Sequence, residues 1–178
     1  MTSQRKIAVG VVIGAVLIAA SCSESTSSGL AVKEAFVADL TGPNERPTPI
    51  TTNASGHADV SVLDTNLIRV DLRVSTIDSV TQAHIHAGDA SIAGPIIVFL
   101  LPNLAAGRPP ITGTDVPLSS VDINRSTPVC SGGLPLPCFQ PPFTLDTLFF
   151  RIRNGTAYAN VHTRKNLGGE IRGQIVPK

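Results

Sequence analysis

The chain has 178 residues and a formal net charge of +1, and only 15% of its residues are charged. It has no basic stripe with interleaved aromatic side chains, so nucleic acid is not an expected partner. Even without an N-terminal leader, the chain has the length of an ordinary single domain with its own hydrophobic core.

The first 21 residues have the layout of a secretory signal peptide. Arg5 and Lys6 precede an apolar run that extends from Ile7 to Ala20. This run is shorter than the roughly 20 residues that a membrane-spanning helix needs. The sequence therefore predicts a signal for export rather than a transmembrane helix.

The signal ends in "IAASC", which resembles the lipobox of bacterial lipoproteins. In that family the signal is cut before the cysteine, which then carries acyl chains. Ala20, Ser21 and Cys22 match the pattern, whereas Ala19 stands where the family prefers leucine. The resemblance implies lipidation at Cys22, a flexible tether over residues 22–30, and a membrane-anchored protein that faces the periplasm or the cell exterior. The alternative is an ordinary secretory signal with an incidental Cys22.

Two further cysteines, Cys130 and Cys138, enclose the short stretch "SGGLPLP". Their spacing is wider than the C-x-x-C of a usual metal-binding pair. A small loop rich in Gly and Pro between two cysteines is typical of a disulfide in an oxidising compartment. We therefore expect a disulfide that pins a loop without regular structure.

Residues 31–178 are expected to form one all-β domain. Short alternating segments of β-branched residues are separated by frequent Pro and Gly, which is typical of an antiparallel sandwich or barrel. Residues 102–142, rich in Pro, Gly and Ser, are expected to form a long excursion held by the disulfide. The expected strands cover 31–42, 58–63, 67–74, 81–88, 94–101, 155–164 and 169–177, with 64–66 as a hairpin turn.

One segment departs from the β pattern. Residues 144–155 are expected to form a short helix, with Thr144 as its N-cap and Gly155 just past its end. Its apolar residues recur at helical spacing: Leu145, Leu148, Phe149 and Ile152.

Three expected strand segments each place polar side chains on a single face, because residues two apart in a strand point the same way. If these strands are neighbours, the three sets combine into one polar patch. The sets are His84 and His86; Tyr158, Asn160 and His162; and Glu170, Arg172 and Gln174.

Two interpretations of this patch stay open, and we take the structural one as the leading hypothesis. In it, Glu170 and Arg172 pair with each other or with nearby groups, Asn160 ties a turn, and the histidines donate to backbone carbonyls. Such a closed hydrogen-bond network fixes the strand register. In the alternative, the imidazoles of His84, His86 and His162 bind a zinc or copper ion.

Neither the remaining histidine nor a comparison with known catalytic motifs indicates a further functional site. His57 follows a turn and is expected to be an exposed residue at the start of a strand, outside any ligand set. The sequence has no nucleophile elbow, no phosphate-binding glycine loop and no dinucleotide fingerprint, so no catalytic residue is assigned.

Three stretches together resemble the CHRD domain, a module named after chordin and present in many bacterial exported proteins. They are "FVADLTGPNERPTPITTNASGHADVSV", "AHIHAGDASIAGPIIVFL" and "LFFRIRNGTAYANVHTRKNLGGEIRGQI". The matching residues are Leu40, Gly42, Glu45 and Pro47; His84, His86, Gly88, Gly94 and Pro95; and Gly155, Tyr158, Asn160, Val161, His162, Thr163, Gly169, Glu170, Ile171, Arg172, Gly173 and Gln174.

This resemblance implies an immunoglobulin-like antiparallel β-sandwich and export, and it implies little about activity. The growth-factor role of chordin depends on other domains that this chain lacks, so that role is not transferred. We therefore expect a non-catalytic binding or assembly module, tethered to a membrane by its lipid, with an unknown protein or extracellular ligand as partner and no cofactor.

A second similarity concerns metal binding. "AHIHAGD" is similar to the copper-binding H-x-H strand of copper-zinc superoxide dismutase, which is also a β-sandwich. That enzyme needs more histidines than this chain offers, so dismutase activity is not expected. A single copper or zinc site at His84, His86 and His162 remains the alternative function.

Overall fold

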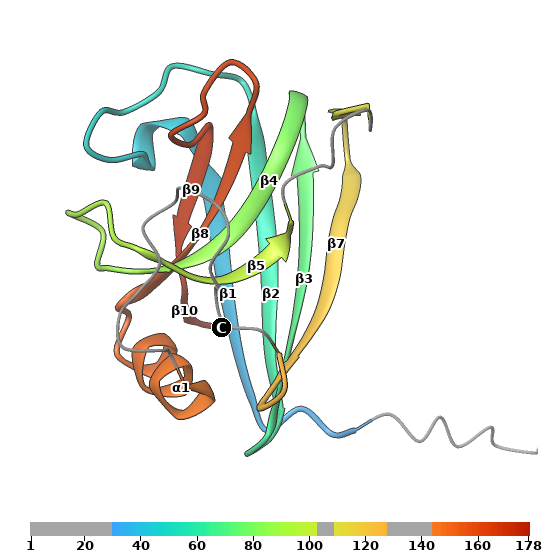
Figure 1. Ribbon diagram of the computed structural model, residues 1–178, viewed down its shortest axis with the longest axis vertical. Helices are drawn as coiled ribbons and strands as arrows, with labels where there is room; N and C mark the ends of the chain where they lie inside the picture. The colour runs from blue at the N-terminus through green and yellow to red at the C-terminus, as the bar shows by residue number, and fades with distance from the viewer. Residues whose placement is uncertain (1–29, 103–108, 128–143) are drawn as a thin grey trace, which may run out of the picture.

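The computed structural model describes residues 30–102, 109–127 and 144–178 (Figure 1). Within these ranges the chain forms ten β-strands, one α-helix and one short 3-10 helix. In chain order they are β1 Glu34–Thr41, η1 Gly42–Asn44, β2 Ser55–Asp64, β3 Leu67–Ser75, β4 Ile77–Ala87, β5 Ile96–Leu101, β6 Ile111–Gly113, β7 Val116–Asn124, α1 Leu145–Arg153, β8 Ala157–Thr163, β9 Ile171–Gln174 and β10 Val176–Pro177.

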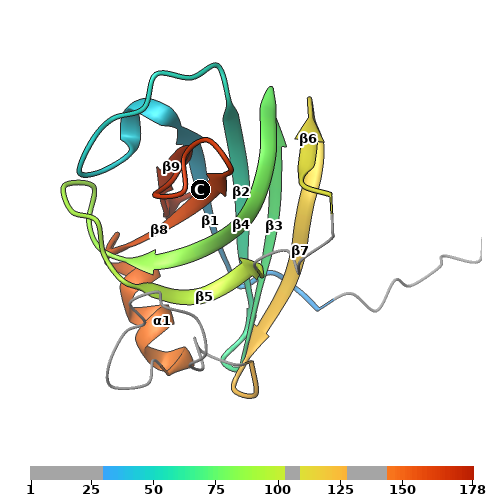
Figure 2. The same cartoon turned by 45° about the horizontal axis from the view of Figure 1, so that its top comes forward.

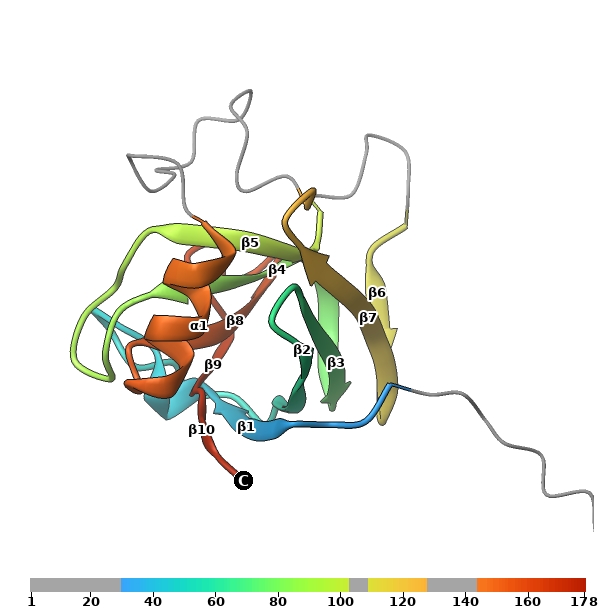
Figure 3. The same ribbon diagram turned by 90° about the horizontal axis from the view of Figure 1, so that it is seen from below.

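All ten strands belong to one antiparallel sheet. Its main order is β5-β4-β8-β9-β1-β2-β3-β7, while β6 pairs with β4 and β10 pairs with β1. The two ends of this order, β5 and β7, contact each other. The sheet therefore curls almost into a barrel, and Figure 3 shows this curl end-on.

The predicted all-β antiparallel class with one short helix is confirmed, but its division into the two sheets of a sandwich is wrong. A continuous sheet can turn around one core where its ladders contain bulges, because bulges bend and twist the strands. The pairing of β2 with β3 shifts between Val62 and Asp64, and that of β4 with β8 shifts between Val80 and Gln82. Such register shifts have no spacing signature in the sequence, so a curled single sheet and a two-sheet sandwich cannot be distinguished from the sequence pattern.

The interpretation of residues 102–142 as one long excursion is also wrong in part. β6 and β7 lie inside it, and β7 pairs with β3 from Leu67↔Asn124 to Val74↔Val116. Of the β7 side chains only Leu118 and Ile123 are buried, so the strand lacks a clear alternation. Cys22, Cys130 and Cys138 lie outside the described residues, so lipidation and the disulfide stay predictions.

The inner face of the curled sheet forms the core. In β3 the alternation is regular: Ile68, Val70, Leu72 and Val74 are buried, and the residues between them face outward. β4 and β8 differ, because the last six residues of β4 and all seven of β8 are buried on both faces. Polar side chains on their outer face are thus removed from water. Within the described ranges, no helix is both long and apolar enough to cross a membrane.

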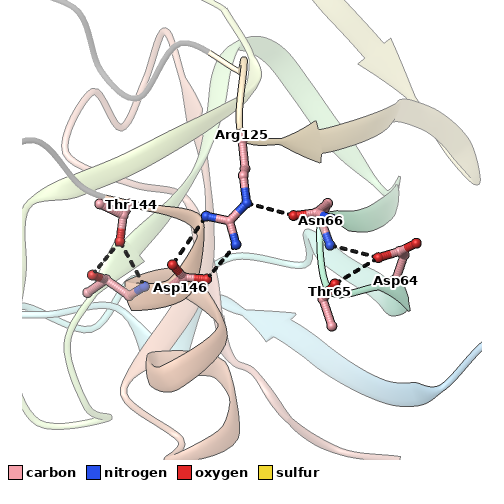
Figure 4. Close-up of polar contacts among 7 residues, drawn as sticks. Asp64, Thr65, Asn66, Arg125, Thr144 and Asp146 are labelled. Atoms are coloured by element: carbon pink, nitrogen blue, oxygen red, sulfur yellow. Dashed lines mark hydrogen bonds and ion pairs between the residues drawn. The ribbon is translucent and has the colours of Figure 1, made fainter.

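Helix α1 closes one end of the barrel and confirms the helix prediction. Its buried residues are the four that recur at helical spacing, and the Thr144 side chain accepts a hydrogen bond from Thr147 N at 3.2 Å. Arg125, just after β7, donates to Asp146 in the first turn of α1 and to Asn66 in the β2–β3 turn (Figure 4). The cap and this arginine fix the helix start against two strand ends.

The N-cap gives a direct test of this arrangement. Thr144→Ala should lower the free energy of unfolding by about 1 kcal/mol, because it leaves a helix N–H without its acceptor. Urea denaturation of the full chain measures the change. Thr144→Ser keeps the hydroxyl and should retain most of the stability; equal midpoints for wild type and Thr144→Ala would contradict the capping role.

Candidate functional site

The predicted polar sets do lie together, on the outer face of β4, β8 and β9. In register, His84 lies opposite Asn160, and Asn160 lies opposite Arg172. The intervening residues, such as Ile85 and Val161, point into the core. Strand adjacency therefore brings groups from distant parts of the sequence to one place, as the same-face pattern predicted.

Three connections cover this face: residues 45–54, 88–95 and 164–170. Figures 1 and 2 show them on the same side of the molecule, around β8 and β9. Each connection supplies hydrogen-bond partners to the layer through Glu45, Gly94 or Leu167. The polar layer is thus enclosed between the sheet and its own loops.

His84, His86 and His162 form a compact cluster within this layer. One ring nitrogen of each lies within 4.8 Å of the others, and His84 Nδ1 is 3.1 Å from His162 Nε2. The side chains are 0%, 8% and 6% exposed, respectively. Three buried imidazoles therefore converge on one small volume, with His86 and His162 at its more accessible edge.

Backbone carbonyls determine which nitrogen of two rings carries the proton. His86 Nδ1 lies 2.9 Å from Gly94 O, and His162 Nδ1 lies 2.9 Å from Leu167 O. A carbonyl can only accept, so each ring donates from Nδ1 and keeps its lone pair on Nε2. Histidines that bind metals are commonly oriented by such a bond from the second nitrogen.

Gly94 makes this contact possible through a close approach of two backbone segments. A Cβ at this position would lie 1.5 Å from the carbonyl oxygen of Ala87, so no other residue fits without moving the loop. This explains in physical terms why the sequence has glycine eight residues after His86.

Burial keeps the cluster uncharged at neutral pH. It lowers the pKa of His84 to about 2, with help from the neighbouring His162 and His86. It lowers the pKa of His86 to about 4 and also lowers that of His162. Neutral imidazoles are the form that binds metal ions.

The layer contains more buried acceptors than donors to pair with them. Five side-chain acceptor atoms on β4, β8 and β9 have no hydrogen-bond partner among the described residues. Such atoms are costly to bury unless a donor or a cation meets them. They are His84 Nε2, His86 Nε2, Gln82 Oε1, Asn160 Oδ1 and Gln174 Oε1. His162 Nε2 faces His84 Nδ1 at 3.1 Å, so two of the three neutral imidazoles have an unpaired lone pair. Three imidazoles that converge in this way are a ligand set that fits zinc or copper.

The other part of the layer is a hydrogen-bonded framework. The Arg172 guanidinium lies 3.5 Å from the Tyr158 ring centroid and donates to the carbonyls of Asp89 and Ile92. His86 stacks on the same tyrosine, with ring centroids 4.9 Å apart and planes 10° from parallel. This stack holds the 88–95 connection and the His86 ring in fixed positions.

Glu170 and Arg172 use separate partners rather than each other. Glu170 accepts from Thr163 and from Asn166. Burial raises the pKa of Glu170, but hydrogen bonds, including those from Thr52 and Asn166, outweigh this and hold the pKa below its usual value. Its role is to fix the 164–170 turn that carries Leu167.

Glu45 is a member of the site that residue patterns alone did not assign. It is 3% exposed, and its Oε1 accepts from Asn160 Nδ2 at 2.6 Å. Gly169 makes room for it, since a Cβ there would lie 2.6 Å from Glu45 Oε2. Its only signal in the sequence was its place in the family motif, because it lies outside the strands.

His57 lies apart from the cluster, on β2. Its side chain is 44% exposed, and its Nδ1 is 2.7 Å from Asp39 Oδ1. It therefore belongs to the outer surface of the sheet, as its position after a turn predicted.

The fold and the polar layer define a single-sheet, antiparallel β-module whose outer face carries a buried three-histidine cluster. A family model for the CHRD domain matches residues 36–175. The chain belongs to the CHRD family, as the three sequence stretches predicted, and this membership suggests a non-catalytic extracellular module. Comparisons with curated proteins and with solved structures gave no match.

Glu45 provides a pH test of the layer. Burial raises its pKa to about 7, which outweighs the hydrogen bond from Asn160 and the charge of Arg172. Its protonated form is therefore favoured in the fold, and this contribution is complete below pH 4.5 and is lost as pH rises through 7. Glu45→Gln should remove this loss. Between pH 4.5 and pH 8 its free energy of unfolding should therefore rise by up to about 3 kcal/mol relative to that of wild type.

Urea denaturation at a series of pH values measures this difference. The direction of the pH dependence separates a raised from a lowered pKa of Glu45. If Arg172 stabilised the carboxylate enough to lower the pKa, the stability contributed by Glu45 would increase with pH instead of decreasing. Parallel pH profiles for wild type and Glu45→Gln would contradict a raised pKa at this position.

Proposed function

We propose that this CHRD module binds one transition-metal ion, zinc or copper, through His84, His86 and His162. The observation that carries the proposal is the convergence of three buried, uncharged imidazoles with one nitrogen of each within 4.8 Å of the others. A purely structural role would pair each ring with protein groups on both sides. Instead, His84 Nε2 and His86 Nε2 have no partner among the described residues.

The structural interpretation of the patch is retained for its other part. Tyr158, Asn160, Glu170 and Arg172 are held by hydrogen bonds or stacking to the three connections. In this proposal the two interpretations that the sequence left open apply to neighbouring halves of one layer. The framework half supports the proposal by fixing the rings before an ion arrives, which lowers the entropic cost of binding.

We further propose that the module is exported and tethered by a lipidated Cys22. The lipobox-like ending and the polar tether after it support this, and family membership agrees with an extracellular role. A metal ion held close to a membrane surface suits binding or delivery rather than turnover, and no catalytic residue is assigned. A protein partner or an extracellular ligand at the domain surface remains the second candidate function.

Metal binding is tested by isothermal titration of the full chain with Zn²⁺ and with Cu²⁺. We expect saturable one-to-one binding that His84→Ala and His162→Ala abolish. At free metal about 100-fold above Kd, ligation adds about 2.7 kcal/mol of stability, which raises Tm by roughly 5–10 °C.

His57→Ala is the matched control, because it removes the one histidine outside the cluster. It should bind with wild-type stoichiometry and affinity. Binding that His57→Ala abolishes and His84→Ala preserves would overturn the site assignment, as would a wild-type chain without saturable binding.

Anchoring is tested by mass spectrometry of the mature protein and by membrane fractionation. We expect an acylated N-terminal Cys22 and membrane association that Cys22→Ala removes, because several acyl chains are needed for stable anchoring. Cys130→Ala should stay in the membrane fraction. A mature N-terminus elsewhere, or an unmodified Cys22, would exclude the lipid anchor.

A further inference from the structure

Gln82 lies next to the histidine cluster and has no role in the function proposed so far. It is on the outer face of β4, two residues before His84 and directly opposite His162 in the register. The residue is 8% exposed, and its Oε1 has no hydrogen-bond partner among the described residues. Leaving a buried acceptor unpaired costs roughly 1–3 kcal/mol, so a partner for this oxygen is expected.

Two other amide oxygens of the layer lack partners, but their side chains belong to the framework half. Gln174 lies on β9, which is not adjacent to β4, and its Nε2 donates to three backbone carbonyls. Asn160 Nδ2 is held by Glu45 Oε1 at 2.6 Å. Gln82 is the amide that shares a strand and a face with two of the three histidines.

We propose that Gln82 Oε1 is the fourth ligand of the ion held by His84, His86 and His162, an inference that rests on the proposed function. A glutamine oxygen can complete a copper site as a weak ligand. Four protein ligands leave no open position on a tetrahedral ion, which is the mark of a structural rather than a catalytic site. Gln82 thus determines whether the bound ion is shielded from small molecules.

Two substitutions with opposite expected effects test this role. Gln82→Ala removes the oxygen and should weaken Zn²⁺ binding by at least about tenfold, since loss of even an outer-shell partner costs about 10–100-fold in affinity. Gln82→Glu places a carboxylate at the same position and should strengthen Zn²⁺ binding about tenfold, because it adds a negatively charged ligand. Because a nearby carboxylate attracts a cation even without coordinating it, a gain in Gln82→Glu supports a ligand role only together with the loss in Gln82→Ala and the azide response below.

The coordination sphere is tested with the Co²⁺-loaded full chain and azide as a small probe ligand. The visible absorption spectrum of the wild type should not change on addition of azide. That of Gln82→Ala should change, because loss of the oxygen opens a position on the ion. Gln82→Met keeps the side-chain volume, and it replaces Gln82→Ala in both measurements if thermal unfolding shows that the alanine variant is not folded.

The outcomes separate this inference from the function on which it rests. If the wild type binds Zn²⁺, His84→Ala abolishes binding, and the Gln82 variants match the wild type in affinity and azide response, Gln82 is not a ligand. If Gln82→Glu binds Zn²⁺ more weakly than wild type, the oxygen does not face the ion. If the wild type itself binds no metal, the proposed function fails, and the role of Gln82 fails with it.

Discussion

The burial of polar side chains on the outer face of β4, β8 and β9 is the constraint on which the rest of the structure depends. Most sheets with one face on a core leave the other face in water. Here that face carries imidazole, amide and guanidinium groups that the 45–54, 88–95 and 164–170 connections enclose. Each buried polar group needs a partner, so the conformation of the connections is fixed by what the sheet presents to them. The contacts of Gly94 with His86 and of Leu167 with His162 are the clearest cases.

These partners also explain why the layer is left with spare acceptors. The groups that the 88–95 and 164–170 connections direct at the histidines and at Arg172 are mostly backbone carbonyls, which can only accept. They satisfy the N–H groups of His86, His162 and the guanidinium, while His84 Nδ1 faces His162 Nε2. The Nε2 lone pairs of His84 and His86 stay unpaired among the described residues. Because burial also keeps the rings uncharged, those lone pairs cannot be quenched by protons at neutral pH. A site with surplus lone pairs on uncharged rings is suited to a cation.

The sequence predicted the parts of this arrangement that depend on local periodicity. Alternation placed His84 with His86 and Asn160 with His162 on common faces, and the helical spacing of Leu145, Leu148, Phe149 and Ile152 located α1. It missed what depends on contacts between distant segments. β7 was lost because serines and a proline interrupt its apolar positions, and the single curled sheet depends on bulges that no spacing reveals. Glu45 was not assigned because a side chain in a connection has no spacing pattern until its neighbours are known. Gln82 shares the alternation of His84 and His86, but an amide in a strand gives no sign of a ligand role before its burial and its unpaired oxygen are known.

The loops that orient the histidines also limit access to them. The same contacts therefore make the cluster rigid and restrict which ligands can reach it. His84 is fully buried, and only the edges of His86 and His162 reach the surface. In the proposed metal site, an ion entering by that route would lose most of its water, and direct protein ligands would have to replace it. The stack of His86 on Tyr158, with Arg172 against the same ring, keeps the His86 ring from turning outward. Breaking the hydrogen bonds of Asn160, Glu170 and Arg172 would therefore let an ion enter the proposed site more easily and also bind there less tightly. These three residues thus influence metal binding without being proposed as ligands.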